Sequence, residues 1–283
     1  MRVVLATIAL NEAEFIPRQL EQHLDWPGLV GWVWVEGAAE YYARKHPQAV
    51  SADGRSVDAT SRLLAEAAQR DSRVRYVAHG WARGNERTMG GQKIQLRNAY
   101  CKVADELDAD VLVVIDADEF YSKADQGRIL DIMATFGTDY DAFLFRQRHL
   151  WRPPALLGSD DALEVVGGYW AVPHVRVWWY ERGARYQNHN HLALPGLGYD
   201  PSRLYRPRPA DPECVHLGFA RDPRHRLRTN AYYVARGEGR EQGFNRKHYV
   251  NCREAWAFWV PGAQLPNGAS VRPYDAALPE VLQ

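Results

Sequence analysis

The stretch that decides the fold is VLVVIDADEFY at residues 111–121. Its first five residues are all aliphatic, which is typical of a strand that is buried on both faces of a parallel sheet, so a strand that ends in acidic residues is expected over 111–121. Asp116 and Asp118 follow this run, so one or both carboxylates are expected at the carboxyl edge of the sheet, where ligands bind. Two carboxylates repel each other unless a cation joins them, and oxygen ligands suit Mg²⁺ or Mn²⁺, which bridge nucleotide phosphates. The alternative is an acidic residue that only caps the following turn or helix.

Strand-like and helix-like segments alternate before this stretch. Apolar runs typical of strands lie at residues 3–10, 31–38 and 74–80, and helical spacing of apolar residues occupies residues 15–24, 56–69 and 90–107. Such alternation requires crossover connections and predicts an α/β fold with a mostly parallel, Rossmann-like sheet flanked by helices.

The alternation ends near residue 141. Strands are expected at 141–151 and 172–181, and a helical stretch near 224–236. The segment 195–214 is so rich in Pro and Gly that it predicts a long loop or lid. We therefore expect residues 1–140 and residues 141–283 to form two halves of one compact domain, the second of them with a C-terminal extension.

The composition is that of an ordinary globular protein. The 283 residues include 35 basic and 35 acidic ones, and 46% are hydrophobic. This length excludes a small disulfide-stapled scaffold, and the balanced charge excludes a uniformly basic nucleic-acid binder or a polybasic membrane anchor. Because no apolar run approaches the roughly 20 residues that a membrane helix needs, no membrane span is expected.

The cysteines and the N-terminus favour a cytoplasmic location. Cys101, Cys214 and Cys252 are widely spaced and form no C-x-x-C pair, so neither a disulfide framework nor a zinc knuckle is indicated. The first apolar stretch is short and is soon followed by Glu12 and Glu14, which is unlike a secretory signal.

The charge is unevenly distributed along the chain. Residues 1–150 contain 18 basic and 22 acidic side chains, whereas residues 151–283 contain 17 basic and 13 acidic ones. The acidic part holds the carboxylates that a metal needs. The basic part is compatible with a local anion-binding surface, although the chain as a whole is neutral.

Several segments, in order along residues 3–220, carry a family resemblance. They are VVLATIALNEAEFIPRQLEQHL (3–24), WVWVEGAA (32–39), GRSVDATSRLLAE (54–66), GGQKIQLRNAYCKVADELDADVLVVIDADEFY (90–121), HVRVWWYERGARYQNHNHLAL (174–194) and CVHLGF (214–219). Together they resemble the family 2 glycosyltransferases, which have the nucleotide-sugar-binding GT-A fold, and especially the branch with a D-x-D-E-F motif. Glu36 stands where that family usually has Asp.

The resemblance implies one catalytic domain with a donor-binding half at residues 1–140 and an acceptor-binding half with a C-terminal extension at residues 141–283. The nucleoside is expected at the end of the first strand, at Thr7, Ala9, Asn11 and Glu12. Glu36 is expected to accept a hydrogen bond from the base or the ribose, and a carboxylate favours the N–H edge of uracil or guanine. A UDP-sugar is therefore the favoured donor.

The resemblance also implies a diphosphate and metal site. Lys93 or Arg97 is expected to contact the diphosphate; the alternative is an Arg97 exposed on its helix and paired to an acidic neighbour, Asp105 or Glu106. Asp118 is expected as the first metal ligand and Asp116 as the second. His216, in H-L-G-F, is either a late third ligand or a structural histidine.

The catalytic base is less clearly marked. An inverting transferase needs a carboxylate or a His that removes the acceptor proton. The related branch often has a His-Glu pair, but here His191 is followed by Leu. The candidates are Asp161, Asp160 and Glu164, with His191 behind them. This departure leaves open a different acceptor geometry, a retaining mechanism or an inactive descendant.

A basic and aromatic segment at residues 221–259 is the candidate acceptor surface. Its part at 221–253 contains nine Lys or Arg residues and three acidic ones, interleaved with Tyr and Phe. Such a mixture binds phosphates by charge and bases by stacking, or packs on the apolar faces of sugars. The alternative is a solvated amphipathic helix. An acceptor glycan and a nucleic acid, such as hydroxymethylated DNA with a flipped base, both remain open.

The sequence thus favours a metal-dependent transferase that moves a sugar from a nucleoside diphosphate to a hydroxyl group. Two alternatives come from other classes. A nucleotidyltransferase shares the sheet and the acidic metal site but releases pyrophosphate. A non-catalytic protein that retains the donor pocket binds the nucleotide sugar without turnover.

Overall fold

The computed structural model describes residues 1–45, 47–83, 89–137, 139–150, 163–166, 174–188, 191–196, 200–217, 270–273 and 279–282. The chain divides into two compact units. The first unit comprises Met1–Ala117, Lys123–Phe145 and Val175–Pro212, and the second comprises Asp118–Ser122, Arg146–His174 and Glu213–Gln283.

The first unit contains a mostly parallel sheet. Its strand β1 (Val3–Ala9) pairs in parallel with β2 (Leu29–Ala39) on one side and with β4 (Val111–Val114) on the other. β3 (Val74–Ala82) continues the sheet in parallel beyond β2, and β8 (His174–Trp179) continues it antiparallel beyond β4. The prediction of an α/β fold with a mostly parallel sheet flanked by helices is therefore confirmed.

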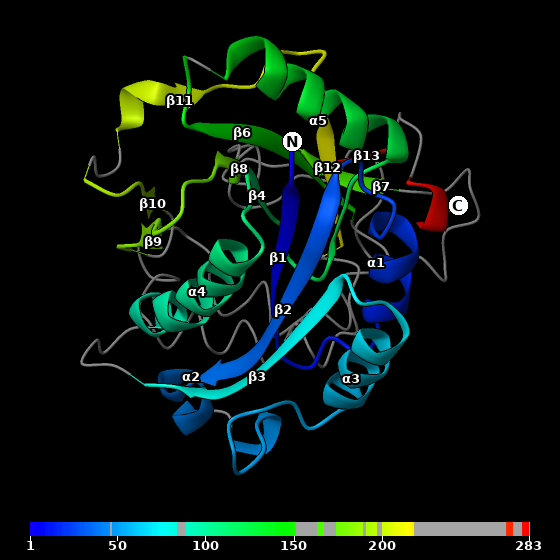
Figure 1. Ribbon diagram of the computed structural model, residues 1–283. Coiled ribbons are helices and arrows are strands. Elements are labelled where there is room, and N and C mark those ends of the chain that lie inside the picture. Colours follow the sequence, from blue (N-terminus) through cyan, green and yellow to red (C-terminus); the bar gives the residue numbers. More distant parts are fainter. Residues whose placement is uncertain are drawn as a thin grey trace. The chain divides into compact units, whose positions relative to one another are not determined.

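The strands bury both faces because their side chains alternate between two helical layers. Val4 and Ala6 of β1 lie in one apolar cluster with Val33 and Val35 of β2 and with the apolar side of helix α4 (Met89–Glu106). Figure 1 shows α4 on one side of β1, β2 and β3, and helices α1 and α3 on the other. A strand covered on both faces reads as a continuous apolar run, which is why β1 and β4 were visible in the sequence.

The second face of this sheet is lined by aromatic residues and covered by α1 (Ile16–His23) and α3 (Thr60–Arg70). The indole Nε1 of Trp32 donates to Thr7 Oγ1 at 3.0 Å. The His23 ring packs edge-on against Trp32, and burial lowers the pKa of His23 to about 3. His23 is therefore a neutral core residue at physiological pH, because its charged form cannot be hydrated there.

Shorter elements complete the first unit. They are α2 (Glu40–Lys45), the 3₁₀ turns Pro47–Ala49 and Pro201–Arg203, helix α5 (Lys123–Phe136), the hairpin of β9 (Arg185–Tyr186) and β10 (Leu192–Ala193), and β11 (Leu204–Tyr205), which pairs in parallel with the start of β6 (Ala142–Leu150).

The second unit is built around the end of β6. There β12 (Glu213–His216) pairs in parallel with β6 and antiparallel with β5 (Glu119–Phe120). β7 (Leu163–Val166) pairs antiparallel with β6, and β13 (Ser270–Pro273) pairs antiparallel with β7. A 3₁₀ turn spans Glu280–Leu282.

Three sequence predictions of local structure are wrong. The strand expected over 111–121 ends at Val114, and a turn at Ala117 and Asp118 leads into β5, because β4 pairs with β1 whereas β5 pairs with β12. Helix α5 is missing from the prediction, although its Ile129 and Met133 are buried at helical spacing. The long loop expected over 195–214 contains β11 and the start of β12, since two-residue strands leave no readable pattern.

Within the described ranges, no helix is both long enough and apolar enough to cross a lipid bilayer. The expected helix near 224–236 lies outside the described residues.

Candidate functional site

The end of β1 is a rigid corner. Thr7 and Ala9 are fully buried, so both side chains expected near the nucleoside face the protein interior. Asn11 has a positive φ of 59°, a conformation that Asn tolerates better than most residues. Its amide N–H donates to Ser56 Oγ at 2.9 Å, and its side chain donates to the Ala49 carbonyl and accepts from the Val57 amide. The corner is therefore tied to the loop that follows β2.

Glu12 continues this corner into the first helix. Its amide donates to Thr60 Oγ1 at 2.8 Å. Its carbonyl accepts from the amides of Phe15 and Ile16, where α1 begins. The Asn-Glu pair thus links β1, α1 and α3, and it holds the edge of the sheet in one conformation.

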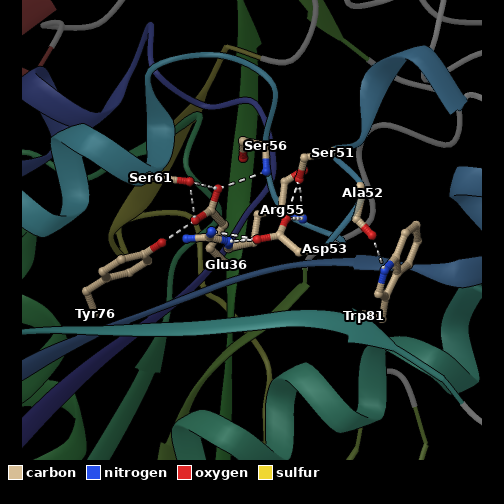
Figure 2. A network of polar contacts seen from close by, with 9 residues as sticks. All are labelled: Glu36, Ser51, Ala52, Asp53, Arg55, Ser56, Ser61, Tyr76 and Trp81. Atoms are coloured by element: carbon tan, nitrogen blue, oxygen red, sulfur yellow. Dashed lines mark hydrogen bonds and ion pairs between the residues drawn. The ribbon is translucent and has the colours of Figure 1, made fainter.

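Glu36 lies near the end of β2 and is fully buried. Figure 2 shows its carboxylate between the Ser56 amide, the Ser61 hydroxyl of α3 and the Tyr76 hydroxyl of β3. The Ser56 amide donates at 2.9 Å, Ser61 Oγ lies 2.8 Å from both carboxylate oxygens, and the Tyr76 hydroxyl also donates. Burial of a carboxylate is costly unless donors surround it. Here the protein itself supplies those donors.

The loop at residues 51–57 is fixed at two further points, both visible in Figure 2. Arg55 forms an ion pair with Asp53 at 2.5 Å, and the Trp81 indole donates to the Ala52 carbonyl at 3.0 Å. Gly54 has a φ of 84°, and a Cβ at this position would lie 2.5 Å from the Trp81 amide nitrogen. Only glycine fits this close approach, so the loop is held against β3.

Helix α4 carries a buried guanidinium, that of Arg97. Arg97 is 8% exposed, donates to the Tyr100 hydroxyl at 3.0 Å and lies 5.0 Å from the centroid of the Tyr186 ring. The alternative of an exposed Arg97 paired to Asp105 is therefore wrong: Arg185 bonds Asp105 at 2.6 Å instead. Lys93 lies on the same helix and is half-buried.

Asp116 lies just beyond β4 in the first unit. Arg176 of β8 donates to its carboxylate at 2.9 Å, and the side chain of Asp116 is 47% exposed. Burial acts to lower the pKa of Arg97, but Tyr100, Tyr186 and Asp116 raise it overall. Asp116 therefore bonds Arg176 and interacts electrostatically with Arg97.

Asp118 belongs to the second unit and pairs with a histidine from the far end of the chain. The antiparallel register of β5 and β12 sets His216 opposite Glu119, and the Leu217 amide donates to the Asp118 carbonyl at 2.8 Å. As a result, His216 Nε2 lies 3.5 Å from Asp118 Oδ2. This is longer than a usual N–H···O bond of about 2.9 Å.

His149 of β6 completes this group and was not found by sequence reasoning. It is 3% exposed, and its Nδ1 lies 2.8 Å from His216 Nδ1, with the two rings edge to face. The parallel register of β6 and β12 pairs the two histidines directly. No pattern in the sequence singles His149 out, because Arg146, Gln147 and Arg148 directly before it in β6 are also polar.

The described residues contain no group of three or more His, Cys, Asp or Glu side chains that would hold a metal. Asp118 and His216 offer one carboxylate oxygen and one imidazole nitrogen within 3.5 Å. Divalent ions in phosphate-handling enzymes often take one or two protein ligands and complete their shell with phosphate oxygens and water. The Asp118–His216 pair fits this kind of donor set.

The structure describes two of the four candidate bases, Glu164 and His191. Asp160 and Asp161 lie outside the described residues, as does the basic segment 221–259. Glu164 lies in β7, opposite Leu150 of β6. His191 is half-buried beside β10; its amide donates to Asn188 Oδ1 at 3.0 Å, and burial lowers its pKa.

Comparisons with known proteins give the following matches. No protein-family model and no curated protein matches the chain. One similar solved structure is mannosyltransferase PcManGT from Pyrobaculum calidifontis in complex with GDP-Man and Mn²⁺, with 16% identity, a TM-score of 0.45, and 82% of this chain and 62% of that chain covered. Another is S. aureus TarS 1–349, with 15% identity, a TM-score of 0.35, and 53% and 36% covered. The chain thus spans about three fifths of the mannosyltransferase and about a third of the TarS structure.

Proposed function

We propose that this chain is a metal-dependent glycosyltransferase of the GT-A type that moves a sugar from a nucleoside diphosphate to a hydroxyl acceptor. The observation that carries the proposal is the approach of His216 to Asp118 at 3.5 Å. The carboxylate lies in the turn between β4 and β5, and the imidazole comes from β12, a strand distant in the sequence. That is the donor set expected of a site that shares a divalent ion with a diphosphate.

The first unit supplies the features expected of a nucleotide site. Ligands of parallel sheets bind at the carboxyl ends of the strands. Asn11 stiffens the end of β1, and the Glu36 network fixes the loop that follows β2. The predicted contact of Glu36 with a base or ribose requires Ser61 or Tyr76 to turn away from the carboxylate. A UDP-sugar therefore remains the favoured donor on sequence grounds alone.

Arg97 and Arg176 are the proposed diphosphate contacts. The orientation of the Arg97 guanidinium is fixed by Tyr100 and Tyr186, and that of Arg176 by its hydrogen bond to Asp116. A guanidinium binds phosphate oxygens with two parallel N–H donors, so a fixed guanidinium loses little entropy on binding. Lys93 is the proposed third cation.

In the proposed reaction, the bond between the anomeric carbon and the diphosphate oxygen breaks while the acceptor oxygen forms a new bond to that carbon. Asp118 and His216, with Asp116 as a further proposed ligand, would hold a divalent ion, which would supply Lewis-acid stabilisation of the leaving diphosphate. Glu164, Asp160, Asp161 or His191 takes the proton of the acceptor hydroxyl. Burial lowers the pKa of His191, so its imidazole is neutral near pH 7.

The acceptor is proposed to be a glycan or a hydroxymethylated nucleic acid, bound by the basic segment 221–259. The charge of that segment favours a polyanion. A change in binding across a salt series distinguishes the two, because phosphate contacts release counterions and neutral sugars do not.

The test is product analysis by mass with a panel of nucleotide sugars, Mn²⁺ or Mg²⁺, and pools of glycans and hydroxymethylated DNA. We expect release of a nucleoside diphosphate and a glycosylated acceptor. Asp118→Asn should lower this release by about three orders of magnitude, whereas Asp131→Asn on the exposed side of α5 should not change it. Release of pyrophosphate would instead identify a nucleotidyltransferase, and tight donor binding without turnover would identify a binding protein.

A further inference from the structure

Two consecutive residues of α4, Arg97 and Asn98, contact the same residue of the β9–β10 hairpin, which lies beside α4 in Figure 1. The Cζ atom of Arg97 lies 5.0 Å from the centroid of the Tyr186 ring. The side chain of Asn98 accepts from the Tyr186 amide at 2.8 Å and donates to the Tyr186 carbonyl at 3.3 Å. Helix α4 therefore contacts the ring of Tyr186 through one residue and its backbone through the next.

The register of the hairpin leaves the backbone of Tyr186 available to Asn98. Tyr186 of β9 lies opposite Leu192 of β10, and the next residue, Gln187, donates its amide to the His191 carbonyl. In an antiparallel pair, consecutive residues direct their backbone polar groups alternately toward the partner strand and away from it. The N–H and C=O of Tyr186 thus point away from β10. Asn98 supplies the acceptor and the donor that a further strand would supply.

The partners of Arg97 orient its guanidinium without neutralising it. Its hydrogen bond goes to the neutral Tyr100 hydroxyl, and it lies over the neutral Tyr186 ring. Its interaction with Asp116 is electrostatic. Among the described residues, none accepts a hydrogen bond from the buried Arg97 Nε. Because burial penalises a charge that is not compensated, an anion would stabilise this guanidinium.

We propose that Asn98 is a positioning residue: it fixes the backbone of Tyr186, places the Tyr186 ring against Arg97 and so orients Arg97 for the donor diphosphate. This inference rests on the proposed diphosphate contact of Arg97. An aromatic face attracts a guanidinium but carries no net charge, so the cation remains able to bind phosphate oxygens. A cation that is oriented before the ligand arrives loses less conformational entropy on binding.

A second group of contacts between α4 and the same segment provides a matched control. The Tyr180 hydroxyl donates to the Cys101 carbonyl and to Asp105 Oδ1, both at 2.7 Å, and Arg185 forms an ion pair with Asp105 at 2.6 Å. None of these bonds involves Tyr186. Tyr180→Phe therefore weakens the attachment of the segment to α4 and leaves the pairing of Asn98 with Tyr186 in place.

The first experiment measures the position of Arg97 by NMR of the full chain without metal. Protons above an aromatic ring are shifted upfield by its ring current. We expect an upfield Hε resonance of Arg97 in the wild type, in Tyr186→Phe and in Tyr180→Phe. This shift should be lost in Tyr186→Leu and in Asn98→Ala. An Hε resonance that stays upfield in Asn98→Ala would overturn the proposal.

The second experiment measures the affinity for inorganic diphosphate by isothermal titration calorimetry in metal-free buffer. Asn98→Ala and Tyr186→Leu should each weaken binding about fivefold, whereas Tyr186→Phe, which keeps the ring, and Tyr180→Phe should stay within about twofold of wild type. Equal weakening in Asn98→Ala and Tyr180→Phe would show a general loss of packing and would overturn the proposal.

Arg97→Met separates this inference from the proposed function. If the wild type binds no diphosphate, or if Arg97→Met binds it as the wild type does, the Arg97 contact and the role of Asn98 both fail. If Arg97→Met weakens binding and Asn98→Ala does not, the contact stands and the role of Asn98 is refuted. If both variants weaken binding but no nucleotide sugar supports transfer, the role of Asn98 stands and the proposed transferase activity is refuted.

Discussion

Two buried carboxylates at strand ends, Glu36 in the first unit and Asp118 in the second, have opposite surroundings. Glu36 receives hydrogen bonds from the Ser56 amide, the Ser61 hydroxyl and the Tyr76 hydroxyl. Asp118 instead faces the ring nitrogen of His216 at 3.5 Å. The donors around Glu36 make it a structural link between β2, β3 and α3, whereas Asp118 beside His216 is the proposed cation site. A buried carboxylate therefore has a structural role in one unit and a proposed chemical role in the other.

The largest expected effect comes from Asp118→Asn. The amide keeps the shape but removes the negative charge, so Lewis-acid stabilisation worth several kcal/mol is lost, and turnover should fall by about three orders of magnitude. The thermal midpoint should not fall. Mass spectrometry of the products measures turnover, and circular dichroism measures the thermal midpoint. Turnover that persists with Mn²⁺ removed by a chelator would contradict the assignment of Asp118.

Glu36→Gln should have the opposite effect: it should lower stability and leave metal binding unchanged. The new NH₂ group opposes the donors around it and leaves buried polar groups unsatisfied, so the free energy of unfolding should fall by about 2–3 kcal/mol. Mn²⁺ affinity should stay within about twofold of wild type. Urea unfolding measures the first quantity, with Glu66→Gln on the exposed side of α3 as control. A raised KM for the donor with no loss of stability would instead support the predicted contact of Glu36 with the base.

Arg97→Lys tests the donor side with a smaller effect. A lysine cannot form the two-pronged phosphate contact or stack on Tyr186 in the same way. We expect the KM for the nucleotide sugar to rise about tenfold, which corresponds to about 1.4 kcal/mol. Steady-state kinetics measure this, and Arg62→Lys, exposed on α3, is the control. An unchanged KM with a lower melting temperature would show that Arg97 has only a structural role.

The smallest expected effect is that of Tyr76→Phe. Loss of one donor to Glu36 should cost about 1 kcal/mol near pH 7. Burial and the neighbouring Glu36 raise the pKa of Tyr76 above its ordinary value. The folded protein therefore holds this proton to a higher pH than the unfolded chain does, and its stabilisation is present below about pH 10 and lost above it. Urea unfolding at pH 7 and pH 11 should show the difference between wild type and variant shrinking; a constant difference would contradict the shift.

The sequence was informative where one local pattern determined the structure. The apolar runs of β1, β2 and β4 predicted the parallel sheet because burial on both faces leaves a continuous apolar segment. Helix α5 also had a readable pattern, in the spacing of Ile129 and Met133, which the prediction did not use. The pattern that predicts each of these elements lies within the element's own few residues.

The candidate site was less accessible because it depends on strand register. The pairing of His149 with His216 follows from the alignment of β6 with β12, and the approach of His216 to Asp118 follows from the alignment of β12 with β5. Short strands of two and four residues carry no periodic signal that specifies such an alignment. The saturation of Glu36 was equally hidden, because its donors come from α3, β3 and a loop.

The most direct test of the contrast between the two carboxylates is an anomalous difference map from crystals grown with Mn²⁺ and a nucleoside diphosphate. We expect an anomalous peak in contact with Asp118 and His216 and none beside Glu36. A bound nucleotide with no Mn²⁺ peak at Asp118, or a peak at Glu36 instead, would contradict the metal site.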